Sequence, residues 1–251
     1  MDQKKHWNNI APSYNDEIFD VFASDRNKIL HRYFKKHANA DHNAIDFGCG
    51  VGKAFPYLSP AFRHVLGTDI SADCIAIAKA KGFPNVSFKV ADLTSKKLKF
   101  SPADFAFCCN VIMLPEVDRN MNMFINIQRS LKKNGTAVIV VPALESAMFS
   151  GWRLISWFKK EGVAPEKIPT DELSGFKKSK IDIIQGLINI NGVITKHYAE
   201  PELRVLLAQA GLTITAIEKI EYNWNTEFNS PPSWMKAPYP WDWLIELKND
   251  R

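Results

Sequence analysis

Cysteines are few in this sequence, and they form no pattern that binds a metal or exchanges electrons. The 251 residues include only Cys49, Cys74, Cys108 and Cys109. None belongs to a CxxC pair and no cluster of histidines accompanies them, so neither a zinc site nor a redox pair is indicated. We therefore expect reduced thiols, as in cytosolic proteins, and no bound metal.

Long apolar runs and blocks of like charge are missing as well. No uncharged apolar run approaches the ~20 residues of a membrane-spanning helix, and the first residues lack the apolar stretch of a secretion signal. The net charge is +5, with lysine and arginine scattered along the chain, which favours a solvated surface over a stripe that follows phosphates. We expect a cytoplasmic protein without nucleic-acid partners or stable membrane insertion. An interfacial helix over residues 147–160 is the alternative.

The sequence does contain an alternation of short apolar strands and helices. Apolar residues make up 46% of the chain, and its length fits a single domain over residues 1–251. The pattern predicts strands over residues 44–47, 64–69, 86–90, 104–109 and 136–141, and helices over 17–38, 71–82 and 118–131. Strands joined by helices imply a parallel sheet with helices on both faces.

The pattern changes after Pro142. Two apolar stretches, Met148–Phe158 and Ile181–Ile190, are expected to be helical, and a polar segment over residues 162–180 separates them. We interpret residues 145–195 as a helical insertion that faces the substrate as a lid.

Beyond the insertion, the alternation resumes. A helix is predicted from Pro201 to Gly211, followed by strands over residues 213–222 and 243–248. Because their connection is short, the two strands are expected to pair antiparallel.

A glycine-rich turn after the first predicted strand is the central motif. Gly48, Gly50 and Gly52 let the backbone turn sharply, approach a ligand closely and leave N–H groups free at a helix start. Such a turn suits a dinucleotide or adenosylmethionine. Lys53 stands where the dinucleotide fingerprint needs its third glycine, which argues against a nicotinamide-dependent oxidoreductase.

Acidic residues follow the next two strands. Asp69 ends the second strand, 19 residues after Gly50, where a carboxylate can accept both hydroxyls of a ribose. Asp92 follows the third strand, where it can accept from an adenine amino group. Three consecutive strand ends would then surround one nucleoside. The alternative is that Asp69 caps the helix that begins at Ser71 and that Asp92 is a surface acid.

Together these motifs resemble the class I S-adenosylmethionine-dependent methyltransferases. The resemblance is carried by WNNIAPSY at 7–14, DFGCGVG at 46–52, GTDIS at 67–71, ADL at 91–93, CNVI at 109–112, LKKNG at 131–135 and YAEPEL at 198–203. It covers residues 5–145 well and 196–248 loosely. It implies a Rossmann-like α/β fold whose seven-stranded sheet has the order 3-2-1-4-5-7-6, with strand 7 antiparallel and a helical insertion after strand 5. The implied cofactor is S-adenosyl-L-methionine.

The resemblance also implies a cofactor site. In this site Tyr14 is expected to close over the cofactor, and Asp46, Gly48, Cys49 and Gly50 to form the turn beneath it. Asp69 is expected to hold the ribose and Ile70 to pack on the adenine face. Asp92 and the Leu93 backbone are expected at the adenine edge, and Asn110 beside the methionine amino group. For Tyr14 and Asn110, roles in the core or at a cap are equally open.

Methyl transfer depends mainly on the alignment of the nucleophile, the methyl carbon and the sulfur, and on the exclusion of water. A base is needed only if the acceptor must lose a proton. Relatives often carry a histidine after strand four, but Met113 stands there, so His197 is the candidate catalytic imidazole, with a structural role as its alternative. Trp152, Tyr198 and Trp224 are candidates to line an acceptor pocket. The alternative is that the aromatic residues pack the insertion onto the sheet.

The sequence thus predicts methyl transfer to an oxygen or nitrogen of a small apolar or aromatic molecule by a monomer or oligomer. Asn110 is followed by Val111 and Ile112, and not by the Pro-Pro-Tyr run suited to a flipped base amine, which argues against a nucleic-acid substrate. A nucleic-acid or protein methyltransferase and a non-catalytic cofactor-binding protein are the alternatives.

Overall fold

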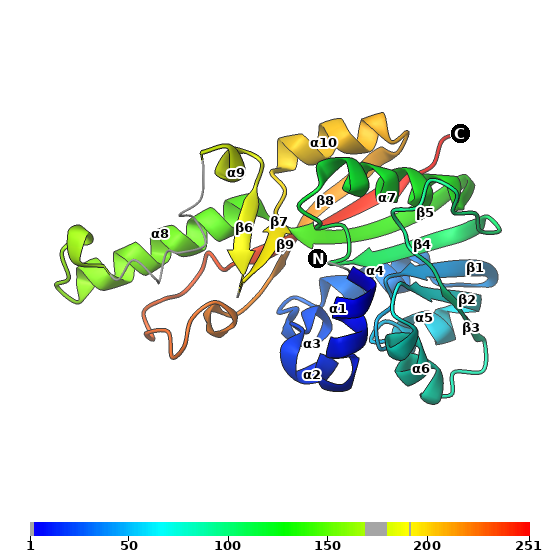
Figure 1. Ribbon diagram of the computed structural model, residues 1–251, viewed down its shortest axis with the longest axis horizontal. Coiled ribbons are helices and arrows are strands. Elements are labelled where there is room, and N and C mark those ends of the chain that lie inside the picture. The colour runs from blue at the N-terminus through cyan, green and yellow to red at the C-terminus, as the bar shows by residue number, and fades with distance from the viewer. Residues whose placement is uncertain (1–2, 169–179, 191) are drawn as a thin grey trace.

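The computed structural model describes residues 3–168, 180–190 and 192–251 (Figure 1). A central seven-stranded sheet has the order β3-β2-β1-β4-β5-β9-β8. Its strands are β1 Asn39–Phe47, β2 Phe62–Asp69, β3 Val86–Val90, β4 Ala103–Cys109, β5 Leu131–Pro142, β8 Thr213–Glu221 and β9 Trp241–Lys248. Strands β1 to β5 pair in parallel, and β9 pairs antiparallel with both β5 and β8. The predicted fold class and strand order are confirmed, with β8 and β9 as strands six and seven.

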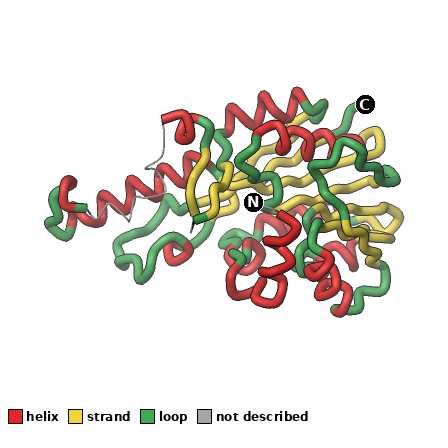
Figure 2. Tube along the Cα trace, in the orientation of Figure 1, coloured by secondary structure: helices red, strands yellow, loops and turns green. Residues whose placement is uncertain are grey.

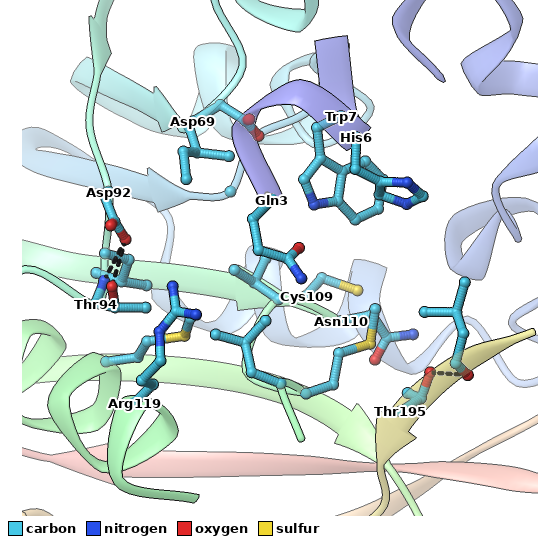
Figure 3. Close-up of a pocket in the computed structure, with 18 of the residues that line it drawn as sticks. Gln3, His6, Trp7, Asp69, Asp92, Thr94, Cys109, Asn110, Arg119 and Thr195 are labelled. Atoms are coloured by element: carbon cyan, nitrogen blue, oxygen red, sulfur yellow. Dashed lines mark hydrogen bonds between the residues drawn. The ribbon is translucent and has the colours of Figure 1, made fainter. Parts of the chain in front are cut away.

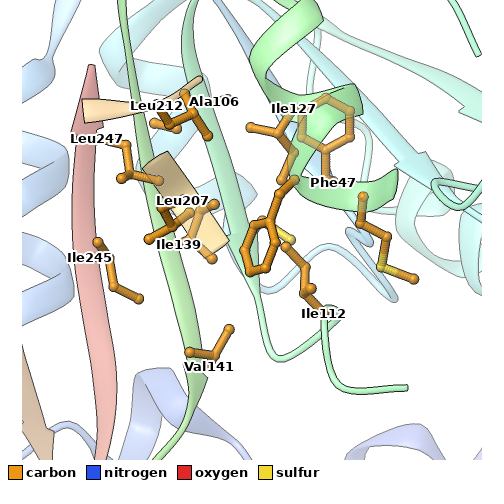
Figure 4. Close-up of a cluster of buried hydrophobic side chains, with 14 of the residues drawn as sticks. Phe47, Ala106, Ile112, Ile127, Ile139, Val141, Leu207, Leu212, Ile245 and Leu247 are labelled. Carbon is orange, nitrogen blue, oxygen red and sulfur yellow. The ribbon is translucent and has the colours of Figure 1, made fainter. Parts of the chain in front are cut away.

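Helices cover both faces of the sheet (Figures 1 and 2). Residues of α4 Ile29–His37, α5 Phe55–Ala61 and α6 Ala72–Ala80 share one buried apolar cluster, and residues of α7 Val117–Arg129 and α10 Glu200–Gln209 share another. Side chains of β5 alternate between the two: Val138 and Val140 join the first cluster, Ile139 and Val141 the second (Figure 4). This period-two alternation, with both faces covered, explains why the second half of β5, residues 137–142, is apolar without interruption.

The helix predicted over residues 17–38 is wrong as one element. The chain forms α2 Tyr14–Glu17, α3 Val21–Ser24 and α4 instead. Asp20 caps α3 by accepting a hydrogen bond from the Ala23 N–H at 3.0 Å, and the Asp25 carboxylate accepts from the Leu30 N–H at 2.8 Å. Since short acidic side chains compete with the helix for backbone donors, they divide a run whose apolar spacing alone suggests continuity.

The insertion contains helices and a hairpin. α8 Leu144–Lys160 includes the predicted stretch Met148–Phe158, but Ile181–Ile190 is not one helix: α9 Lys180–Ile184 is followed by β6 Leu187–Ile190, which pairs antiparallel with β7 Val193–Lys196. Gly186 marks the change, with φ +69° and a backbone so close to His197 that a Cβ would lie 2.2 Å from its carbonyl oxygen. Most of the predicted polar segment 162–180 lies outside the described residues.

Backbone hydrogen bonds hold the hairpin at the carboxyl ends of the parallel strands. Ala143 and Tyr198 form a parallel bridge beyond the end of β5, and the Tyr198 N–H donates to the Pro142 carbonyl at 2.9 Å. The Lys196 N–H donates to the carbonyl of Met113, in the loop after β4, at 2.9 Å. The insertion therefore leaves and returns at the sheet edge where ligands of open α/β sheets bind.

Within the described residues, no helix is long and apolar enough to cross a membrane, and no group of three or more His, Cys, Asp or Glu side chains could hold a metal ion. The four cysteines are free thiols.

Candidate active site

A cavity opens at the carboxyl ends of β1 to β4 (Figure 3). The strand ends form its floor, α1 Gln3–Ile10 covers one side, and the hairpin strand β7 contributes another wall. Its lining residues are Gln3, His6, Trp7, Tyr14, Gly48, Thr68, Asp69, Ile70, Ala91, Asp92, Leu93, Thr94, Cys109, Asn110, Val111, Met113, Leu114, Pro115, Arg119, Met123, Val193, Ile194 and Thr195.

The glycine turn after β1 allows side chains to close over it. Gly48 has φ +66° and Gly50 has φ +51°, the left-handed region that glycine adopts without strain. A Cβ at Gly48 would lie 2.2 Å from Val111 Cγ2, and one at Gly50 would lie 2.5 Å from the Tyr14 hydroxyl. The missing side chains therefore give room for Val111 and Tyr14 above the turn.

Asp69 lies at the end of β2 with its carboxylate tied to the backbone. Oδ2 accepts from the Gly50 N–H at 2.9 Å and Oδ1 from the Ser71 N–H at 2.8 Å. Burial raises the pKa of this carboxyl, and the N–H donors of Ser71 and Gly50 offset part of the rise. Because an ionised carboxylate offers about four acceptor sites, Asp69 retains capacity for two ligand hydroxyls.

Asp92, beyond β3, presents one oxygen to the cavity side. Oδ1 accepts both from the Thr94 N–H at 2.8 Å and from the Thr94 hydroxyl at 2.7 Å. Within the described chain no hydrogen bond falls on Oδ2, which leaves this oxygen for a donor such as an exocyclic amine.

The N-terminal segment is fixed over the cavity by contacts to α6. The Ser71 hydroxyl donates to Asn8 Oδ1 at 2.7 Å while its oxygen accepts from the Cys74 N–H at 3.1 Å, so one residue caps α6 and anchors α1. Lys53 pairs with Asp20 at 2.8 Å, which ties the glycine turn to α3. These contacts hold the rings of Trp7 and Tyr14 over the cavity, with their centroids 6.3 Å apart.

The cavity brings together seven of the ten residues predicted to bind the cofactor: Tyr14, Gly48, Asp69, Ile70, Asp92, Leu93 and Asn110. The other three, Asp46, Cys49 and Gly50, do not line the cavity. Asp46 is 2% exposed, and its Oδ2 is buried without a partner in the described structure. Burial, followed by the charge of Asp69, raises the pKa of Asp46 well above its ordinary value.

His197, the predicted catalytic residue, is 6% exposed and does not belong to the cavity wall. Its Nδ1 lies 3.2 Å from the Thr195 carbonyl oxygen, a contact that assigns the proton to Nδ1. Burial lowers the pKa of His197 to about 4. The neutral imidazole thus lies outside the cavity wall and contacts the backbone of β7.

The buried imidazole predicts a pH-dependent stability. The pKa of His197 falls from 6.5 to about 4 on folding, so its contribution is complete above pH 6.5 and is lost as the pH drops toward 4. The loss from this one group amounts to about 3 kcal/mol at most. Urea unfolding of the wild type and of His197→Gln between pH 8 and pH 4.5 should give a shallower pH slope for the variant. Equal slopes would contradict the assignment.

The three candidate substrate residues also lie outside the cavity wall. Trp152 is 57% exposed on α8, Trp224 is 3% exposed, and Tyr198 is fully buried against Phe124. Phe149 has its ring 6.0 Å from that of Trp152 and 5.7 Å from that of Trp224. Phe149 and Trp224 thus bring α8 into contact with the loop between β8 and β9.

Several lining residues were not predicted. Gln3 and His6 come from α1, Arg119 from the start of α7, and Val193–Thr195 from the hairpin. Other unpredicted lining residues, namely Trp7, Thr68, Ala91, Cys109, Val111 and Met113, do lie in segments that the sequence analysis had singled out. Spacing on α1 offered a weak signal, since Gln3, His6 and Trp7 follow a helical period of three to four residues.

Comparisons with known proteins agree with this geometry. Residues 44–135 match a family model described as "Methyltransferase domain". A probable S-adenosylmethionine-dependent methyltransferase, CRG1 of Saccharomyces cerevisiae, is 32% identical over 77 residues, which are 31% of this chain and 23% of that protein. A putative methyltransferase, 235L of Invertebrate iridescent virus 6, is 29% identical over 111 residues, or 43% of this chain and 40% of the viral protein. The matches thus span less than half the length of these curated relatives.

Similarity of fold extends over most of the chain. The crystal structure of an S-adenosylmethionine-dependent methyltransferase from Mesorhizobium loti superposes with a TM-score of 0.63 at 15% identity, and the match covers 91% of this chain and 100% of that one. The sheet order and the converging strand ends define a class I methyltransferase fold. Residues 44–135 are thus similar in sequence to methyltransferases, and the described chain has the fold of a class I S-adenosylmethionine-dependent methyltransferase.

The cavity fits the cofactor of this class, S-adenosylmethionine. Carboxylates of Asp69 and Asp92 face the cavity with acceptor capacity to spare, as ribose hydroxyls and an adenine amino group require. At Gly48 the backbone of the floor carries no side chain. Asn110 Oδ1 is buried without a partner in the described structure, a further acceptor that awaits a donor.

Proposed function

We propose that this protein transfers a methyl group from S-adenosylmethionine to an oxygen or nitrogen of a small, largely apolar molecule. One observation carries the proposal: the glycine turn, Asp69, Asp92 and Asn110 stand at four neighbouring strand ends around a single cavity that α1 and the hairpin cover. Bound there, the cofactor supplies an activated methyl group on a sulfonium whose leaving group is a neutral thioether.

The residues of the chain serve mainly to bind, orient and exclude water. Asp69 and Asp92 hold the nucleoside, while Tyr14 and Trp7 keep bulk water from it. Near the hairpin the wall is apolar, with Met113, Leu114, Pro115, Val193 and Ile194. Such a wall favours an apolar acceptor that fits beneath the hairpin. Where the acceptor must give up a proton, His6 is the imidazole in the wall, and we assign it that role in place of His197.

The arrangement of the chain supports separate roles for the sheet edge, which holds the cofactor, and the insertion, which faces the acceptor. We propose that residues 1–251 act as one methyltransferase domain in which the insertion 145–195, through β7, serves as the lid on the acceptor side. Only the described part of the insertion, which lacks residues 169–179 and 191, supports this assignment.

The test of the proposed function measures cofactor binding first and then identifies the methylated product. Calorimetry should detect binding of S-adenosylhomocysteine and none of NAD. Incubation of a metabolite extract with methyl-labelled cofactor, followed by mass spectrometry, should then find label in a small apolar compound. Label only in the protein or nucleic-acid fraction would overturn the choice of acceptor, and cofactor binding without any labelled product would favour a non-catalytic role.

The hairpin wall should govern the acceptor and spare the cofactor. Ile194→Ser removes apolar contact area from the cavity, so KM for the acceptor is expected to rise about 5- to 30-fold. The affinity for S-adenosylhomocysteine should stay within about twofold, because the strand-end carboxylates are unchanged. Val205→Ser, on the exposed side of α10, is the matched control, and an equal change of KM in both variants would refute the role of Ile194.

A further inference from the structure

Beside the cavity, three polar side chains from three elements form a buried network. Asn110 follows β4, Asp242 lies on β9 and Tyr222 follows β8. Asn110 Nδ2 donates to Asp242 Oδ2 at 2.9 Å, and the Tyr222 hydroxyl donates to the same oxygen at 2.8 Å. Asp242 is 9% exposed and Tyr222 3% exposed. Asp242 does not itself belong to the cavity wall, whereas Asn110 does (Figure 3).

The carboxylate fixes which way the carboxamide of Asn110 points. Burial raises the pKa of Asp242 to about 6, so the group is ionised at pH 8 and only accepts hydrogen bonds. An acceptor-only neighbour requires the NH₂ side of the amide, and Oδ1 must then face away from it. The backbone of Asn110 is fixed as well, with φ +52° and its N–H bonded to the Val140 carbonyl at 3.0 Å.

The oxygen that is turned away lacks a partner. Asn110 Oδ1 is buried and receives no hydrogen bond from any described residue. A buried acceptor without a donor is costly, so its persistence indicates a ligand that supplies one. The carboxylates of Asp69 and Asp92 account for donors of an adenosine. Outside its adenosine, the proposed cofactor has a single nitrogen donor, the ammonium group.

We propose that Asp242 is a positioning residue that holds the Asn110 carboxamide with Oδ1 toward the ammonium group of the bound cofactor. The inference rests on the proposed function and deepens it. Asp242 acts through Asn110 and touches neither cofactor nor acceptor. The Tyr222 hydroxyl supports the carboxylate but does not set the orientation of the amide.

Two ligands separate this role from a general contribution to folding. S-adenosylhomocysteine carries the ammonium group, and 5′-methylthioadenosine has the same nucleoside without the amino-acid part. Calorimetry at pH 8 on the full chain gives the ratio of the two dissociation constants. In Asp242→Asn both amides can donate, so Asn110 is free to turn its NH₂ toward the cavity.

We expect Asp242→Asn to bind S-adenosylhomocysteine about 10- to 100-fold more weakly and 5′-methylthioadenosine within about twofold of the wild type. Tyr222→Phe, the matched control in the same network, should leave the ratio unchanged. The exchange Asn110→Asp with Asp242→Asn should restore it, because the amide introduced at position 242 would then donate to the carboxylate at position 110, whose second oxygen faces the cavity.

Asn110→Ala provides a measurement that does not depend on the folding of Asp242→Asn. It should show the same selective loss, since the acceptor itself is removed. A loss of equal size for both ligands, an unchanged affinity in a folded Asp242→Asn, or a matching selective loss in Tyr222→Phe would overturn the proposal. A wild-type protein that binds neither ligand would overturn the proposed function, and this inference with it.

Discussion

Asp69→Ala is expected to weaken binding of S-adenosylhomocysteine about 10- to 100-fold, because the hydrogen bonds of two ribose hydroxyls would be lost together. The carboxylate is the only acidic group at the end of β2, and it lines the cavity directly. It also accepts from the Gly50 and Ser71 N–H groups, so its removal loosens the glycine turn that we propose to hold the cofactor. Calorimetric titration of the purified variant measures the change.

A matched control distinguishes this loss from a general effect of removing a buried acid. Asp104, at the opposite end of the sheet, accepts from the Asn43 N–H at 2.9 Å and pairs with Lys132 at 2.8 Å. Asp104→Ala should lower stability with little change in cofactor affinity. If Asp69→Ala folds, by circular dichroism, and binds as tightly as the wild type, then its carboxylate does not hold the ribose.

Phe55→Ala should lower the free energy of unfolding by about 3–5 kcal/mol. Phe55 is fully buried, and its ring lies against two glycines: a Cβ at Gly52 would be 2.6 Å from its Cδ2, and one at Gly67 would be 2.6 Å from its Cζ. The ring therefore fills the space that these glycines leave between the turn and β2. Since α5 begins with Phe55, its loss also frees the end of the turn.

Urea denaturation measures this effect, with Ile77→Ala as the comparison. Ile77 is 37% exposed on α6, so its truncation should cost less than about 1 kcal/mol. A similarly small cost for Phe55→Ala would mean that the pocket between Gly52 and Gly67 closes without the ring.

Much of the fold could be predicted because local patterns and tertiary packing agree. β3 spans Val86–Val90, as the alternation of strands and helices predicted, and the order of the sheet followed from the resemblance. Disagreement arose where individual side-chain and backbone contacts decide the structure. The divided helix depends on the carboxylates of Asp20 and Asp25, and the hairpin depends on how closely Gly186 approaches His197, neither of which is visible in periodicity.

The candidate active site, like the fold, could be predicted only in part. Gly48, Asp69 and Asp92 sit at strand ends, and once strands are assigned as parallel, their convergence is a matter of geometry. His6 and Ile194, by contrast, reach the cavity because α1 docks on α6 and because β7 bonds to the loop after β4. Such placements depend on packing between segments far apart in sequence, so spacing along the chain could not reveal them.

The bridge between Ala143 and Tyr198 has a practical meaning for redesign. Residues 144–197 leave the end of β5 and come back to the same point, so the two cut sites of a graft are already neighbours. A shorter or foreign segment can span them without altering the distance between β5 and α10. We expect chimaeras made at this junction to keep the nucleoside-binding half intact while exchanging the chemical range of acceptors that the enzyme accommodates.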